Sequence, residues 1–200
     1  IAFDFAPSYN FHVDKLRFDS ELRSIRKRFR WVEAVMAPAK RVEEILRADA
    51  VEGGNQPSYV AIHLRRRGYN EFCSTGLDFY NRQRFGVEVT EEMCWPSAAT
   101  VADQALAAAS AAGTDRVFVA TDDTDENTNG DIRALRAKGL KIWLATTALA
   151  AEVQLGSELQ PLVEQALCAA ADHFIGNLAS SFSFAIAQER EVRGMALGSM

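Results

Sequence analysis

Four short segments rich in apolar and β-branched residues recur along the chain, and each is followed by a stretch with helical character. The apolar segments span residues 58–64, 115–121, 140–146 and 172–176. The helical stretches after them cover residues 97–112, 130–138, 157–171 and 181–192. Short continuous apolar runs indicate strands buried on both faces. Their alternation with helices predicts an α/β fold, with a Rossmann-like parallel sheet and helices on both faces.

A further helical region precedes the first predicted strand. Asp19 or Ser20 offers an N-cap, and Pro38 is expected to end or kink the helix that follows. The apolar face of this helix consists of Leu22, Ile25, Phe29, Val32 and Met36, and a second helical stretch runs to Leu46. Its cationic face carries Arg23, Arg26, Lys27, Arg28 and Arg30, which suits a solvated surface better than an acidic partner.

Composition sets the broad class of the protein. The 200 residues are 48% hydrophobic, enough for one well-packed domain. A formal net charge of -5 gives no support for nucleic-acid binding, and no apolar run approaches the roughly 20 residues of a membrane span. The chain starts at Ile1 within sequence typical of a domain interior, without a secretory segment. We therefore expect residues 1–50 to be a helical connection to a missing N-terminal domain and residues 51–200 to be the α/β domain.

The cysteines leave two readings open. Cys73 and Cys94 flank a polar loop and form either a disulfide in an oxidising lumen or two free thiols. Cys168 lies on an alanine-rich helical face and is expected in the core. None of these spacings is typical of a zinc site.

Ligands of open parallel sheets bind beyond the carboxyl ends of the strands, so the residues that follow each strand are the candidates for function. After the first strand, His63 and Arg65 lie two residues apart and point the same way on an extended chain. A guanidinium at this position can bind a phosphate with two hydrogen bonds. Gly68 allows the backbone to turn sharply or to approach a ligand.

The second strand is followed by an acidic loop. Asp122 directly follows Thr121, and its carboxylate could accept two N–H bonds from the edge of a guanine base. Asp123 and Asp125 form a D-x-D pattern that can hold a divalent metal ion, although so short a pattern is common. We favour a binding role for Asp122 and a solvated loop for Asp125 and Glu126.

The fourth strand is followed by a glycine turn and by Ser180 and Ser181, which open a helix. Backbone N–H groups at a helix N-terminus bind phosphate well, and serine hydroxyls add donors. An ordinary serine N-cap is the alternative. Together, the three strand ends would form one pocket with a cation, a diphosphate site and a base-reading acid. No P-loop or G-x-G-x-x-G motif follows any strand.

Three blocks resemble the GDP-fucose protein O-fucosyltransferases and related fucosyltransferases. These are YVAIHLRRRG (59–68), VFVATDD (117–123) and DHFIGNLASSFSFAIAQERE (172–191), and the resemblance extends over residues 36–193. It implies a GT-B fold with two Rossmann-like domains, of which this chain supplies the C-terminal, donor-binding half. It also implies inverting transfer of fucose from GDP-fucose to a hydroxyl, without a metal or other cofactor.

The resemblance also assigns roles by position. Arg65 would bind the β-phosphate and stabilise the leaving GDP, so that it is the catalytic residue. Asp122 would bind guanine, and His63 would line the pocket near the ribose or the diphosphate. The diphosphate would be held by Ser180, Ser181 and Phe182.

The acceptor stays open between a protein Ser/Thr, a glycan and a small-molecule hydroxyl. Tyr69 and Asn70 stand where relatives often have an acid, and the loop from Tyr69 to Pro96 matches no family pattern. The resemblance favours protein Ser/Thr and places the protein in the lumen of the endoplasmic reticulum or Golgi. Two other functions stay open: a non-catalytic nucleotide-binding or interaction module, and a metal-dependent transferase that uses Asp123 and Asp125.

Overall fold

The computed structural model describes residues 24–48, 58–75, 90–145, 158–177 and 180–195. Within these residues, four parallel strands form one sheet in the order β3-β2-β1-β4. The strands are β1 (Val60–Leu64), β2 (Arg116–Thr121), β3 (Lys141–Leu144) and β4 (His173–Ile175). Every residue of β1 and β2 is buried, as expected for strands covered on both faces. The predicted α/β fold with a parallel sheet is confirmed.

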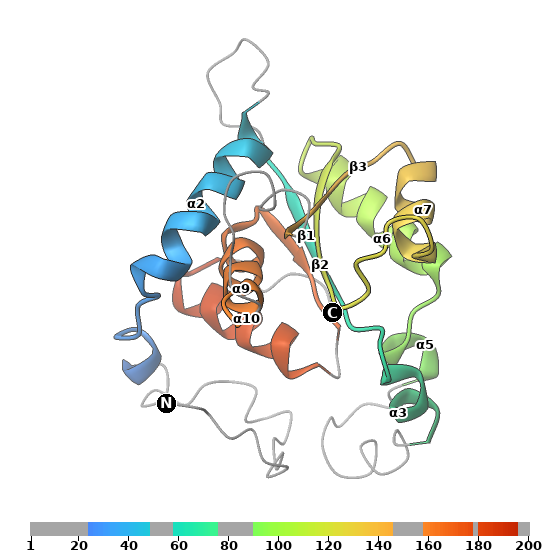
Figure 1. Cartoon of the computed structure of the whole chain (residues 1–200), viewed down its shortest axis with the longest axis horizontal. Coiled ribbons are helices and arrows are strands. Elements are labelled where there is room, and N and C mark those ends of the chain that lie inside the picture. Colours follow the sequence, from blue (N-terminus) through green and yellow to red (C-terminus); the bar gives the residue numbers. More distant parts are fainter. Residues whose placement is uncertain (1–23, 49–57, 76–89, 146–157, 178–179, 196–200) are drawn as a thin grey trace.

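Helices cover both faces of the sheet (Figure 1). The described helices are α2 (Glu33–Arg47), α3 (Tyr69–Thr75), α5 (Glu91–Cys94), α6 (Ala98–Ala111), α7 (Gly130–Ala137), α9 (Gln160–Ala170) and α10 (Ser181–Val192). Residues Val60 and Ile62 of β1 pack in the core under α6 and α7. Tyr59 and Ala61 point the opposite way, into a core shared with α2, α9 and α10.

The N-terminal helix differs from its prediction. Helix α2 begins at Glu33 and continues through Pro38, which is buried, instead of ending there. Residues 24–26 before it are helical and a turn follows them, with the backbone N–H of Arg28 bonded to the carbonyl of Ile25. Crowded cations between residues 26 and 30 disfavour a continuous helix here. As a result, Ile25, Phe29 and Val32 are 53%, 48% and 63% exposed and do not form a buried helical face.

The predicted N-cap at Asp19 or Ser20 lies outside the described residues, as does Arg23.

Helix α2 packs into the same core as α9. The proposed division of the chain at residue 50 stays a prediction, since residues 49–57 are also outside the described part.

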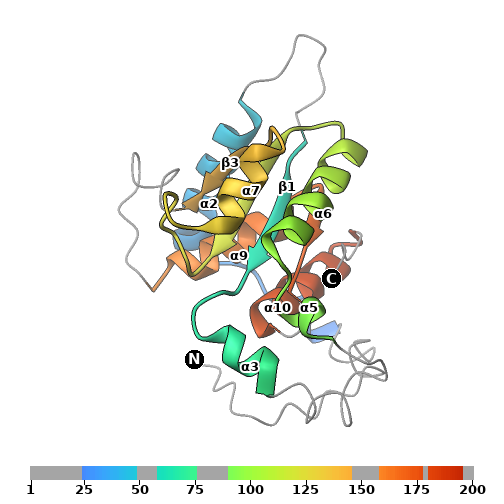
Figure 2. The ribbon, with the colours of Figure 1, turned by 90° about the vertical axis from the view of Figure 1, so that its right-hand side faces the viewer.

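The register of the sheet places the candidate residues together. Leu64, the last residue of β1, is paired with Thr121, the last residue of β2. The segments that follow the two strands therefore leave the sheet side by side. Helices α3 and α5 lie at this end of the sheet (Figures 1 and 2). Gly68 allows the turn into α3 with a φ of 68°, a conformation that other residues rarely adopt.

Candidate functional site

The loop after β1 is held by one carboxylate at the end of β2. Asp122 accepts a hydrogen bond of 2.6 Å from Nη1 of Arg65. Its oxygens also accept the backbone N–H groups of Arg66, at 2.8 Å, and Arg67, at 3.1 Å. The Arg65 side chain is 47% exposed, so a fixed guanidinium faces solvent at the carboxyl edge of the sheet. This is the kind of preorganised cation that binds a phosphate oxygen.

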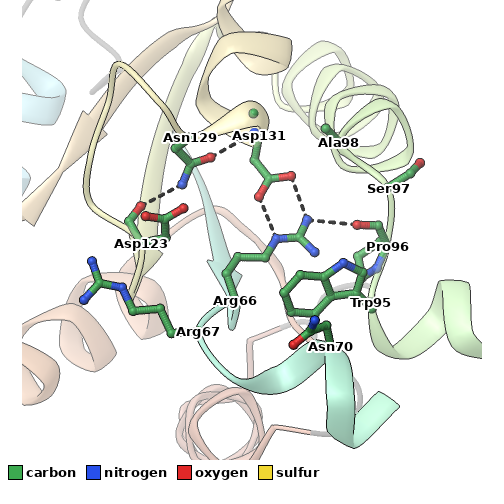
Figure 3. A pocket seen from close by; sticks show the side chains of 11 residues that line it. Arg66, Arg67, Asn70, Trp95, Pro96, Ser97, Ala98, Asp123, Asn129 and Asp131 are labelled. Atoms are coloured by element: carbon green, nitrogen blue, oxygen red, sulfur yellow. Dashed lines mark hydrogen bonds and ion pairs between the residues drawn. The ribbon is translucent and has the colours of Figure 1, made fainter. Parts of the chain in front are cut away.

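Arg66 anchors the same loop from the other side (Figure 3). Its Nε and Nη2 each donate a hydrogen bond of 2.6 Å to the buried carboxylate of Asp131, and Nη2 also donates to the carbonyl of Pro96 at 2.9 Å. The guanidinium lies 4.6 Å from the centre of the Trp95 ring. Asn129 caps α7 by accepting the backbone N–H of Asp131, so the helix N-terminus fixes this acid. Arg66 is thereby tied into the fold rather than exposed.

His63 connects β1 to the first turn of α10. Its Nδ1 lies 2.7 Å from Oγ of Ser183, and its ring stacks on Phe182 with centroids 4.4 Å apart. Burial lowers the pKa of His63 to about 3 and outweighs the attraction of the Asp122 carboxylate. The imidazole is therefore neutral near pH 7 and holds the helix start beside Arg65.

Ser183 extends this network to the segment after β4. Its Oγ accepts the backbone N–H of Asn177 at 2.8 Å, and the Asn177 side chain donates to the carbonyl of Cys94 at 3.0 Å. All of these polar groups are buried. The ends of β1 and β4 are thus linked by hydrogen bonds to each other and to α5.

The start of α10 is the helix N-terminus at which the sequence predicted a phosphate-binding site. Ser180 occupies the N-cap position and is buried, but its side chain makes no capping hydrogen bond. Ser181 is exposed at the first position of the helix. The positive end of the helix dipole therefore lies next to the residues that contact His63. The structure brings His63, Phe182 and the two serines to one place, with Arg65 two residues beyond His63 along the strand direction.

The acidic residues in the loop after β2 have different roles. Asp125 accepts the backbone N–H of Asn127, and Glu126 pairs with Arg136, so both stabilise the loop before α7. Asp123 lines an open hollow next to this loop. The described residues contain no group of three or more His, Cys, Asp or Glu side chains placed to hold a metal ion.

One acid near the site was not predicted from the sequence. Glu164 lies on α9 and is only 8% exposed, with its side chain bonded to Nε2 of Gln160 at 2.9 Å. Burial raises the pKa of Glu164 to about 7, with a smaller contribution from the negative charge of Asp122. A glutamate within an amphipathic helical pattern is predicted to lie on the surface, so nothing in the sequence indicates that Glu164 is buried.

The cysteine question is settled by the structure. Cys73 of α3 and Cys94 of α5 form a disulfide, with their Cα atoms 5.6 Å apart. Cys168 is a free, buried thiol, as predicted. The disulfide holds together a small cluster with Tyr69, Phe72 and Trp95. This cluster lies next to residues 65–67 after β1, which we call the arginine loop.

The fold and this edge of the sheet define a Rossmann-like α/β domain. The family model described as GDP-fucose protein O-fucosyltransferase matches residues 3–193, nearly the whole chain. The protein belongs to this family. A comparison with curated proteins found no match.

Solved structures agree with this assignment at the level of the fold. The chain is similar to POFUT1 in complex with GDP-fucose, with 23% identity and a TM-score of 0.63 over 90% of this chain and 49% of that chain. A second crystal form of that complex gives a TM-score of 0.59 at 23% identity over 86% and 47% of the two chains. The apo form gives 0.62 at 23% identity over 88% and 49%. The chain thus spans about half the length of these structures and matches one half of their GT-B fold.

No helix among the described residues is long and apolar enough to cross a membrane.

Proposed function

We propose that the protein transfers fucose from GDP-fucose to a hydroxyl group of an acceptor, with inversion at the anomeric carbon and without a metal ion. The chain would supply the donor-binding half of the enzyme. Membership of the family supports the reaction class. The observation that carries the proposal is the exposed Arg65 guanidinium, fixed 2.6 Å from Asp122 beside the start of α10.

In this proposal, Arg65 is the catalytic residue. The bond between the anomeric carbon and the β-phosphate oxygen breaks, and both electrons leave with GDP. The acceptor oxygen forms the new bond to the anomeric carbon and releases its proton to water. A fixed guanidinium stabilises the negative charge that develops on the departing diphosphate. Arg65 would not need to reorganise for this step, because Asp122 already orients it.

The remaining predicted residues take binding roles. The start of α10, with Ser180, Ser181 and Phe182, would hold the diphosphate through hydroxyl and backbone donors. His63 would line the pocket near the ribose or diphosphate and keep the helix start in place. Asp122 is proposed to contact guanine, although three hydrogen bonds from the arginine loop already occupy most of its acceptor capacity.

The compartment and the acceptor are proposed by analogy with the family. A luminal location in the endoplasmic reticulum or Golgi agrees with the Cys73–Cys94 disulfide, since such bonds persist in oxidising compartments. The resemblance favours a protein Ser/Thr hydroxyl as acceptor.

Calorimetric titration of the full-length protein with GDP, with manganese and separately with a chelator, tests the proposal. We expect the same binding under both conditions. Binding that disappears with the chelator would support a metal site at Asp123 and Asp125 instead. No GDP binding under either condition would contradict a donor site of any kind.

A further inference from the structure

The chain that leads out of α5 contacts the arginine loop. We call residues 94–96 the bracing segment. The ring centre of Trp95 lies 4.6 Å from the guanidinium carbon of Arg66. The carbonyl of Pro96 accepts a hydrogen bond of 2.9 Å from Nη2 of the same arginine (Figure 3). The residue that follows Arg65 is therefore held by two consecutive residues of the bracing segment.

The bracing segment is also linked to the start of α10. The carbonyl of Cys94 accepts a hydrogen bond of 3.0 Å from the Asn177 side chain. The backbone N–H of Asn177 donates to Oγ of Ser183 at 2.8 Å, and this oxygen lies 2.7 Å from Nδ1 of His63. All three contacts are buried. The bracing segment therefore connects the arginine loop to the helix start at which the diphosphate is proposed to bind.

The disulfide closes a ring of contacts around the arginine loop. Cys94 is bonded to Cys73 of α3, and α3 begins two residues after the loop, with the backbone N–H of Tyr69 bonded to the carbonyl of Arg66 at 3.2 Å. Helices α3 and α5 have only seven and four residues, too few to be stable by themselves. Their relative position therefore depends on the disulfide and on the aromatic residues packed around it.

We propose that the Cys73–Cys94 disulfide and the bracing segment position the donor site, by fixing the Arg65 guanidinium relative to the start of α10. This inference rests on the proposed function. The cysteines and Trp95 are positioning residues, which act through Arg66 and Asn177 rather than by contact with the ligand. A guanidinium that is free to move must be ordered when the ligand binds, and the entropy lost in this step weakens binding.

Comparison of GDP with GMP separates positioning from simple stabilisation. GDP would contact Arg65 and the start of α10 together, so its affinity depends on the spacing between them. GMP lacks the β-phosphate that Arg65 is proposed to bind, so this spacing matters much less to it. A disulfide that only stabilises the fold would, on reduction, lower the folded fraction and weaken the apparent binding of both nucleotides by the same factor.

Calorimetric titration of the full-length protein with GDP and with GMP, before and after reduction, tests this inference. On reduction we expect the affinity for GDP to fall at least about fivefold and the affinity for GMP by less than about twofold. The Cys73→Ser/Cys94→Ser variant should bind GDP as the reduced wild type does and should not respond to reductant. Cys168→Ala removes the free buried thiol and serves as the control, which should respond to reductant as the wild type does.

Two variants test the bracing segment while the disulfide stays intact. Trp95→Leu removes the ring that lies on the Arg66 guanidinium, so GDP should lose at least about three times as much affinity as GMP. Trp95→Phe keeps an aromatic ring at this position and should retain most of the affinity for GDP. Circular dichroism of each sample measures its folded fraction.

Equal GDP affinities in the oxidised and the reduced protein would overturn the inference and leave the proposed function standing. Losses of the same factor for GDP and GMP would also overturn it, because partial unfolding has that effect. If the reduced protein is unfolded, the two Trp95 variants decide, and a GDP affinity of Trp95→Leu equal to that of the wild type would overturn the inference. Absence of GDP binding by the oxidised wild type would remove the proposed function, and the positioning role with it.

Discussion

The guanidinium of Arg65 lies 2.6 Å from the carboxylate of Asp122, which also binds the backbone N–H groups of the next two residues. One side chain at the end of β2 thereby fixes three consecutive residues after β1. Two roles for Asp122 can be separated by experiment. It either reads the base directly, as the resemblance implies, or positions Arg65, the cation that we propose binds the β-phosphate.

The substitution Asp122→Asn removes the charge and one acceptor atom from this contact. Charge-assisted hydrogen bonds contribute about 1.5–3 kcal/mol, so we expect GDP to bind about 10- to 100-fold more weakly by calorimetry. If Asp122 positions Arg65, GMP, which lacks the β-phosphate, should lose much less affinity. Asp103→Asn, at an exposed ion pair on α6, is the matched control. An equal loss for GDP and GMP, together with a lost preference for GDP over UDP, would identify Asp122 as the base reader instead.

Ser183→Ala should destabilise the fold. The substitution leaves the buried His63 imidazole and the Asn177 backbone N–H without their present partner. Unpaired buried polar groups cost about 1–3 kcal/mol each, so for these two groups we expect a loss of about 2–6 kcal/mol in the free energy of unfolding. Urea denaturation measures this, with Ser181→Ala, at an exposed neighbouring serine, as the control. A change below about 0.5 kcal/mol, typical of surface sites, would show that the network contributes little.

Reduction of the Cys73–Cys94 disulfide should also destabilise the protein. The two cysteines are 21 residues apart, and a loop of that size gives a stabilisation of about 3 kcal/mol. We expect the urea midpoint to fall with reductant in the wild type. A Cys73→Ser/Cys94→Ser variant should start from the lower midpoint and not respond to reductant. Identical wild-type midpoints with and without reductant would count against a stabilising disulfide.

Stability should depend on pH through two groups with opposite effects. The pKa of Glu164 is about 7 in the fold and 4.5 in the reference state, so the folded state binds more protons and stability falls as pH rises between these values. The pKa of His63 is about 3 against 6.5, so stability is lost as pH falls from 6.5. In the wild type the two effects oppose each other between pH 4.5 and 6.5.

Glu164→Gln removes the first effect alone. At pH 8 we expect the variant to be more stable than the wild type by on the order of 3 kcal/mol, because a buried carboxylate no longer has to ionise. At pH 4.5 the difference should be much smaller. Urea denaturation at both pH values measures the change, and Glu158→Gln, at an exposed glutamate before α9, serves as control. A difference between variant and wild type that is the same at both pH values would contradict the burial-induced pKa shift of Glu164.

The sequence predicted β1 and β2 well because parallel strands buried on both faces consist of continuous apolar runs. It also located β3, although that strand is only partly buried. It also predicted α6, α7, α9 and α10, and glycines with positive φ follow α6 (Gly113) and α7 (Gly139). It missed α3 and α5, which lie in the segment that it read as a polar loop. The prediction of one continuous N-terminal helix with a buried face was wrong, because an apolar spacing of 3–4 residues does not reveal whether another surface covers it. Ile25, Phe29 and Val32 fit the pattern and are nevertheless exposed.

The site was only partly predictable. Residues that follow strands can be found by rule, which is how Arg65 and Asp122 were selected. Their partners cannot, since the bonds join residues far apart in the chain: Arg66 with Asp131, and His63 with Ser183, 120 positions away. The burial of Glu164 depends on how α9 packs and leaves no local pattern. The strand order, likewise, is not encoded in any one segment.

Titration with GDP-fucose of the wild type, Arg65→Ala and Arg133→Ala tests the central claim most directly. Both substitutions remove one cation, but Arg133 lies on an exposed position of α7 and lines neither the donor site nor the neighbouring hollow. We predict that Arg65→Ala lowers the affinity at least tenfold, while Arg133→Ala binds as the wild type does. Equal affinities for all three proteins would contradict a donor site built around Arg65.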